Sequence, residues 1–161
     1  MKKYWLLFLI GFVIILSGCG ANTKTSINSN KEVKKTANTI FDCLNNDDCE
    51  TMKELFCESS RESSTLDEQI TEAFDFFDGK IVSHDSLEGI GTSGKTVENG
   101  EITKLDASPF IQHIKTDSNK EYEIRFYQYI INDEFPEKVG VSEISIKEVH
   151  GEEIIIGEYV D

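Results

Sequence analysis

The chain has 161 residues, and the 143 that would remain after removal of an 18-residue leader suffice for one domain with a substantial core. The formal net charge is −14, and loss of Lys2 and Lys3 with the leader would make it −16. This acidity disfavours binding to nucleic acid and docking on an anionic membrane surface. An acidic exterior could attract a cationic partner, but the acids look scattered along the chain, which is more simply explained by solubility.

The N-terminus has the organisation of a secretory signal. Lys2 and Lys3 precede an apolar run, Tyr4 to Leu16, which is too short to span a bilayer. Two small residues and Cys19 follow, and the quartet L-S-G-C resembles the lipobox of bacterial lipoproteins, where cleavage leaves an acylated cysteine as the first residue. We expect a signal peptide over 1–18, a lipid on Cys19, and anchoring on the extracytoplasmic face of the cell membrane. An uncleaved anchor that ends in Ser-Gly-Cys is the alternative.

The segment after the leader is small and polar. It reads GANTKTSINSNK and contains no apolar periodicity, so it cannot bury enough surface to order itself. We expect a flexible tether over 19–31 and a single folded domain over 32–161.

The first half of this domain has apolar residues at helical spacing. A first helix ends at Asn45-Asn46, and a second begins where Asp47 and Glu50 form a capping box. The predicted buried residues are Val33, Ala37, Ile40, Phe41 and Leu44 in the first helix and Met52, Leu55 and Phe56 in the second.

A third helix is expected to begin with a capping box at Thr65 and Glu68 and to stop at a left-handed Gly79. Its predicted buried face is Leu66, Ile70, Ala73, Phe74 and Phe77.

The second half has the alternation of strands. Candidates are 80–87, 110–116, 139–149 and 154–156, and the strongest is the long stretch from Tyr122 to Ile130, where apolar and polar residues alternate. Helices followed by four to six antiparallel strands predict an α+β fold, with three N-terminal helices packed on a curved sheet. By analogy, such a sheet would form the cone of NTF2-like domains.

Residues 89–96 read GIGTSGKT and match the pattern of a nucleotide-binding phosphate loop. That loop needs a helix beginning at Lys95-Thr96, but the following residues have no helical periodicity. Asn99-Gly100 is instead typical of a hairpin turn. We therefore interpret the match as a chance one within a flexible hairpin loop, and expect no nucleotide binding.

Three cysteines follow Cys19. Their spacing and the distant histidines do not favour a metal site. Outside the cytoplasm a disulfide is possible, and Cys43–Cys49 is the favoured pair, which leaves Cys57 as a buried thiol. Three free thiols are the alternative.

No catalytic set is evident. His84 and Asp85 would point to opposite faces of a strand, and His113 is expected to be exposed. Arg125, Tyr127 and Tyr129 are the candidates for a polar-aromatic ligand face. We expect no cofactor and no metal.

Several stretches resemble a catalogued family. They are L-D-E-Q-I-T-E-A-F-D-F-F-D-G-K-I-V-S at 66–83 and the stretch 113–146, with F-F-D-G-K-I and I-K-T-D as the most specific pieces. These residues look like small lipoproteins of Gram-positive bacteria catalogued as domain-of-unknown-function family 5104. The resemblance covers the chain from about residue 31 and implies an NTF2-like domain on a lipid anchor. It brings no assigned activity and no catalytic residues.

Three functions remain open. The first is a membrane-anchored module that binds a protein or a small molecule. The second is an immunity or self-protection lipoprotein that sequesters a toxin. The third is an enzyme with one buried acid-base residue in a cone, which would need a closed pocket.

Overall fold

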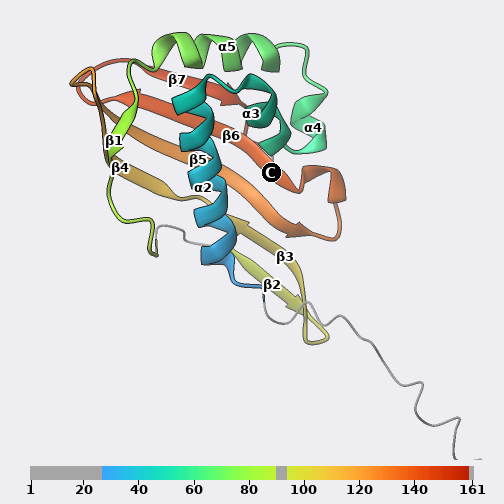
Figure 1. Ribbon diagram of the computed structural model, residues 1–161. Helices are drawn as coiled ribbons and strands as arrows, with labels where there is room; N and C mark the ends of the chain where they lie inside the picture. Colours follow the sequence, from blue (N-terminus) through green and yellow to red (C-terminus); the bar gives the residue numbers. More distant parts are fainter. Residues whose placement is uncertain (1–26, 90–93, 160–161) are drawn as a thin grey trace, which may run out of the picture.

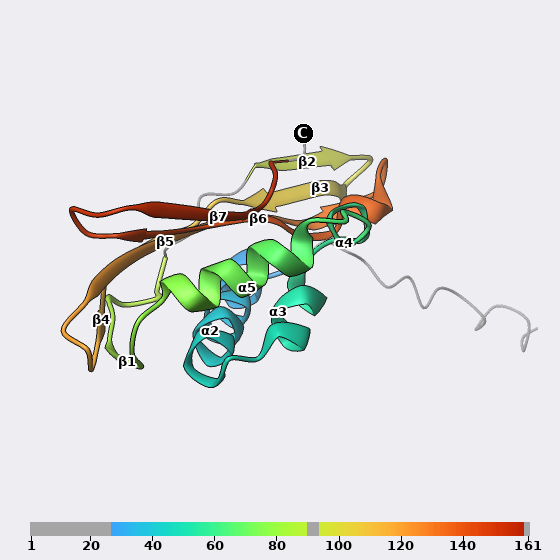
Figure 2. The same ribbon diagram turned by 90° about the horizontal axis from the view of Figure 1, so that it is seen from above.

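The computed structural model describes residues 27–89 and 94–159. In these residues four α-helices lie against one face of a seven-stranded sheet whose strand pairs are antiparallel, and a 3-10 helix (Pro136–Lys138) connects β5 (Glu121–Asn132) to β6 (Gly140–Glu148). Figure 2 shows the helices on one side of the sheet and the opposite face uncovered. The predicted α+β class with an antiparallel sheet is confirmed.

The helical layer buries most of the apolar residues that the sequence indicated, although Leu55 and Phe74 are only partly buried. In chain order they are α2 (Ser29–Asn46), α3 (Cys49–Leu55), α4 (Glu58–Arg61) and α5 (Leu66–Phe76). The five residues predicted for the first buried stripe are all buried in α2, which crosses the strands in Figure 1. The short helix α4 was not predicted, so the expectation of three helices is wrong by one in the described chain.

Two predictions about helix capping are wrong. Asp48, not Asp47, is the N-cap of α3 and accepts a hydrogen bond from the Thr51 N–H at 3.0 Å. Asp47 has a φ of 53° and ends α2 in the left-handed conformation. Thr65 occupies the N-cap position of α5 but its side chain makes no capping hydrogen bond.

The sheet is organised around one long strand, β5 (Glu121–Asn132). On one side it pairs with β6, and on the other it pairs with β4 through its first half and with β3 through its second. β1, β2 and β7 continue the sheet outward from β4, β3 and β6. The other strands are β1 (Ile81–Ser83), β2 (Lys95–Glu98), β3 (Glu101–Ala107), β4 (Phe110–Thr116), β6 (Gly140–Glu148) and β7 (Glu153–Gly157).

The β2–β3 hairpin was only partly predicted. Its turn lies at Asn99-Gly100, where both residues have positive φ, as a tight hairpin turn requires. The strands on either side were not assigned. β2 is exposed along its whole length and has no apolar alternation, whereas β3 buries Ile102, Leu105 and Ala107 and was missed.

The core lies between the helices and the inner face of the sheet. Ile124, Phe126 and Ile144 meet the buried stripes of α2 and α5 there. Tyr122 joins the two layers: its hydroxyl accepts a hydrogen bond from the Asp78 N–H at 3.0 Å, and its ring lies 4.4 Å from that of Phe77. Within 27–89 and 94–159, no helix has the length and apolarity that a membrane span needs.

Candidate ligand-binding face

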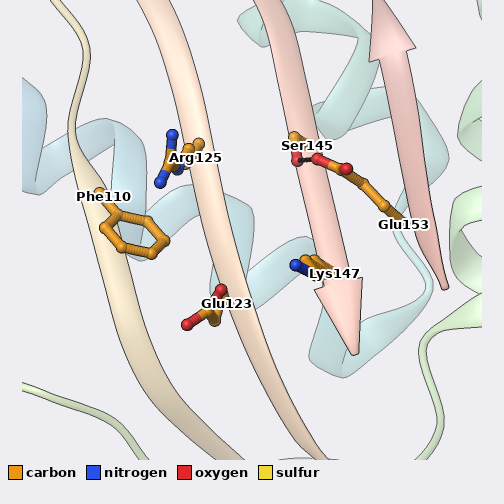
Figure 3. Close-up of a pocket in the computed structure, with 6 residues that line it drawn as sticks. All are labelled: Phe110, Glu123, Arg125, Ser145, Lys147 and Glu153. Carbon is orange, nitrogen blue, oxygen red and sulfur yellow. Dashed lines mark hydrogen bonds between the residues drawn. The ribbon is translucent and has the colours of Figure 1, made fainter. Parts of the chain in front are cut away.

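A cavity of about 210 Å³ opens on the uncovered face of the sheet. Figure 3 shows its lining side chains in front of the strands, with the helices behind. They come from four strands: Phe110 of β4, Glu123 and Arg125 of β5, Ser145 and Lys147 of β6, and Glu153 of β7. Alternate residues of a strand face the same way, so β5 and β6 each contribute two.

The two cations of this cavity are available to a ligand. The Arg125 guanidinium lies 4.0 Å from the centre of the Phe110 ring, a cation–π contact that leaves its N–H donors at the edge. In the described part of the chain Arg125 and Lys147 form no ion pair. By contrast, Lys34, Lys53 and Lys120 each pair with a carboxylate.

The two carboxylates are held by neutral donors. Glu123 Oε1 accepts a hydrogen bond from the Gln112 side-chain amide at 3.1 Å. Glu153 Oε1 accepts one from the Ser145 hydroxyl. On β6, Lys147 pairs with Glu123 of β5 on one side and with Glu153 of β7 on the other. The cavity therefore combines two positive and two negative groups with one aromatic ring.

A cluster of tyrosines continues this face along β5. The Tyr127 ring lies 5.3 Å from that of Tyr129 and 4.7 Å from that of Tyr159, both edge to face. Burial raises the pKa of the Tyr127 hydroxyl, and hydrogen bonding to Tyr129 and Tyr159 raises it further. Tyr127 is therefore neutral at physiological pH and can serve as a hydrogen-bonding aromatic contact.

The three residues predicted to bind a ligand have different positions. Arg125 is exposed and Tyr127 is half-buried, and both lie on the uncovered side. Tyr129 is 2% exposed, so it packs against Tyr127 and cannot be the ligand contact we predicted. Its ring lies against that of Tyr127 and has the Lys104 ammonium 5.0 Å from its centre, so neighbouring side chains cover it.

The sequence did not indicate the pairing of His113 with Asp85. Their side chains meet at 2.9 Å, between Nδ1 and Oδ2. His113 is exposed as predicted, and it sits in the irregular part of β4 with a φ of 53°. The hydrogen bond to Asp85, and then that carboxylate's charge, raise the pKa of the His113 imidazole. His84 instead packs on Phe41, with ring centres 4.7 Å apart.

The three cysteines that the structure describes are free thiols. Cys43 and Cys57 are buried and Cys49 is exposed. The expected Cys43–Cys49 disulfide is therefore not formed in this structure, which instead has the alternative of three free thiols. Burial raises the pKa of Cys43 to about 11, and nearby acidic side chains add to the effect. Cys19, the expected lipidation site, lies outside the described residues.

The end of the phosphate-loop match lies in a strand. Lys95 and Thr96 begin β2 and not a helix, so the donors that a phosphate loop requires are differently arranged. The stretch 90–93 lies outside the described residues. Within the described ranges no group of three or more histidine, cysteine or acidic side chains could hold a metal ion.

The acidic residues are gathered and not scattered. From Asp47 to Asp78 the chain has eleven acidic and two basic residues, and all eleven acidic residues are exposed. This stretch spans α3, α4 and α5, so the helical layer presents a strongly acidic surface. The sequence did not reveal this surface, because the apolar residues of three helices separate the acids along the chain.

The comparisons with known proteins support the resemblance at the level of the family. The model of one family, described as a domain of unknown function (DUF5104), matches residues 39–152. That stretch includes α3 to α5, strands β1 to β6 and every residue that lines the cavity except Glu153, which begins β7. A comparison with curated proteins gave no match. Because the family model covers more than two thirds of the 161 residues, the chain belongs to the DUF5104 family.

Proposed function

We propose that this protein is a lipoprotein held on the extracytoplasmic face of a cell membrane, and that its folded domain binds a protein or a small molecule. The first half of the proposal rests on the leader over 1–18 and on the L-S-G-C quartet that ends at Cys19. Two acyl chains on Cys19 would hold the chain stably on the membrane.

The position of α2 fits this anchoring. The helix begins at Ser29, capped by the Asn28 side chain, only ten residues after Cys19. A chain of that length reaches at most about 35 Å. In Figure 1 the start of α2 lies at the end of the domain that carries β2 and β3. This end would face the membrane, and the β6–β7 and β4–β5 turns would point away from it.

One observation carries the binding function: the uncovered sheet face bears Arg125 stacked on Phe110 and, beside it, the tyrosine cluster. Arginine and tyrosine, together with tryptophan, are enriched at binding hot spots, because they combine a large contact area with hydrogen-bonding groups. Exposed Ile155 of β7 adds an apolar contact to the same sheet.

We also propose that the fold is a variant of the NTF2-like cone, in which a curved sheet wraps around helices. In such a domain a ligand could enter between sheet and helices. Here that space holds apolar side chains such as Ile124, Phe126 and Ile144, which favours the outer face as the binding surface. The same packing weighs against an enzyme with a buried acid-base group inside the cone.

A protective lipoprotein that sequesters a toxin is the second candidate. The observation that favours it is the acidic surface over α3, α4 and α5, which complements a cationic protein. This candidate places the partner on the helical layer, opposite the uncovered sheet face.

Site-directed photocrosslinking in intact cells separates these two surfaces. A photoreactive residue replaces Tyr127 on the sheet face in one variant and Glu72 on α5 in the other; both positions lie outside the core. The proposal predicts a reproducible crosslinked species from Tyr127 only. A species from Glu72 only would favour the protective lipoprotein, and the same weak background from both would refute the binding function for these surfaces.

A further inference from the structure

We propose that the cavity on the uncovered sheet face binds a small zwitterion, a molecule with a carboxylate at one end and an ammonium group at the other, such as a short peptide with free termini. This inference rests on the proposed binding function of that face and names the ligand class. Arg125 and Lys147 would recognise the carboxylate end, and Glu123 and Glu153 would recognise the ammonium end.

The carboxylate would bind to Arg125. One face of its guanidinium is covered by Phe110, at 4.0 Å, which orients the group and leaves the donors of its edge free. A planar fork of N–H donors matches the two oxygens of a carboxylate. Across β5 and β6, Arg125 pairs with Ser145 and Glu123 pairs with Lys147. Lys147 is therefore the diagonal neighbour of Arg125. Diagonal neighbours are about 7–8 Å apart, so one carboxylate can interact with both cations.

The ammonium group would bind to the two carboxylates. Glu123 and Glu153 flank Lys147 in register, and each accepts one side-chain hydrogen bond from a neutral donor. A carboxylate has about four acceptor positions, so each retains capacity for a ligand. Glu153 is exposed at the edge strand β7, where a ligand can reach it directly.

Charge balance favours a zwitterion over a simple anion. The cavity has two positive and two negative side chains, and the whole chain carries −14. A bare anion would approach against the net charge of the protein and would bring no cation to the two carboxylates. A ligand with no net charge is not repelled by the net charge of the protein. Its two ends provide a carboxylate for the cations of the cavity and an ammonium group for its carboxylates. The cavity volume of about 210 Å³ is below the roughly 300–1,000 Å³ of typical ligand pockets, which limits the ligand to a very short peptide.

The sequence offers a direct probe, because the chain contains only two arginines, Arg61 and Arg125. Their side-chain Nε–H signals can be followed by NMR in the ¹⁵N-labelled full chain, purified in detergent. The ligand is triglycine, and the matched blocked peptides are N-acetyl-triglycine and triglycine amide. We expect triglycine to shift the Arg125 signal with saturation and to leave that of Arg61, exposed on α4, unchanged. Each blocked peptide should bind about tenfold more weakly, because each loses one charge-assisted contact.

Variants test the assignment of the two ends. Lys147→Gln should weaken triglycine binding, and Arg125→Lys should abolish the saturable response seen at neighbouring backbone amides. Arg61→Lys is the control and should bind as the wild type does. Equal binding of N-acetyl-triglycine and triglycine would show an anion site and overturn the zwitterion. No response at Arg125 to any of the peptides would overturn the site itself. Either failure leaves the crosslinking result at Tyr127 unaffected, so loss of this inference and loss of the binding function are distinguishable.

Discussion

Replacement of Tyr122 by phenylalanine tests how the helical layer is joined to the sheet. The Tyr122 hydroxyl accepts a hydrogen bond from the Asp78 N–H at 3.0 Å and donates one to the Phe76 carbonyl at 3.4 Å. The side chain is 1% exposed, so no water compensates for the loss of the hydroxyl. The ring keeps its contact with Phe77, and therefore no large cavity forms.

The expected decrease in the free energy of unfolding follows from these contacts. Loss of a buried hydrogen bond, with its donor left unpaired, costs about 1–2 kcal/mol. In a domain of this size that corresponds to a decrease in Tm of roughly 3–8 °C. Thermal unfolding followed by circular dichroism measures it, and Tyr159→Phe is the control, because Tyr159 is 53% exposed and solvent replaces what its hydroxyl loses. If Tyr122→Phe lowered Tm no more than Tyr159→Phe, the hydroxyl would not be joining the two layers.

Two further predictions concern titratable groups. The pKa of His113 should lie above its usual value of about 6.5, and Asp85→Asn should return it towards that value, as an NMR titration of the imidazole can show. Because the pKa of His113 is raised in the folded state, its pair with Asp85 stabilises the fold fully at pH values below the unfolded-state pKa of His113. This stabilisation is lost as pH rises through the folded-state pKa. An unshifted imidazole would contradict the pairing. In the native chain at pH 8, iodoacetamide should modify exposed Cys49 well before Cys43, whose pKa of about 11 and burial suppress the reactive thiolate. Equal rates, measured by peptide mass spectrometry, would contradict the buried position of Cys43.

Local patterns predicted the helices and the long strands well. The stripe of α2 and the alternation along β5 are periodicities that a single face of a core imposes on the sequence. The hairpin turn at Asn99-Gly100 was predictable because few residue pairs adopt positive φ at two successive positions.

Features that depend on the assembled fold were not predictable in this way. Tyr129 is covered by Tyr127 of β5 and Lys104 of β3, and no local pattern indicates that these side chains meet. The pairing of His113 with Asp85 needs two segments 28 residues apart to meet. The cavity combines side chains of four strands, of which the sequence indicated only Arg125.

The acidic surface of the helices has the same origin. Its residues are separated in the sequence by apolar positions of α3 to α5, and they meet only after those positions are buried. A net charge alone therefore gave no information about which face carries it.

Intact-mass analysis of the chain, extracted from the membrane fraction of its native cells, tests the membrane anchor most directly. We expect a chain that begins at Cys19 and carries the added mass of a diacylglyceryl group, and we expect Cys19→Ser to leave an unprocessed, unacylated chain. A wild-type chain that begins at Met1, or one with an unmodified Cys19 thiol, would show that the protein is not anchored by a lipid.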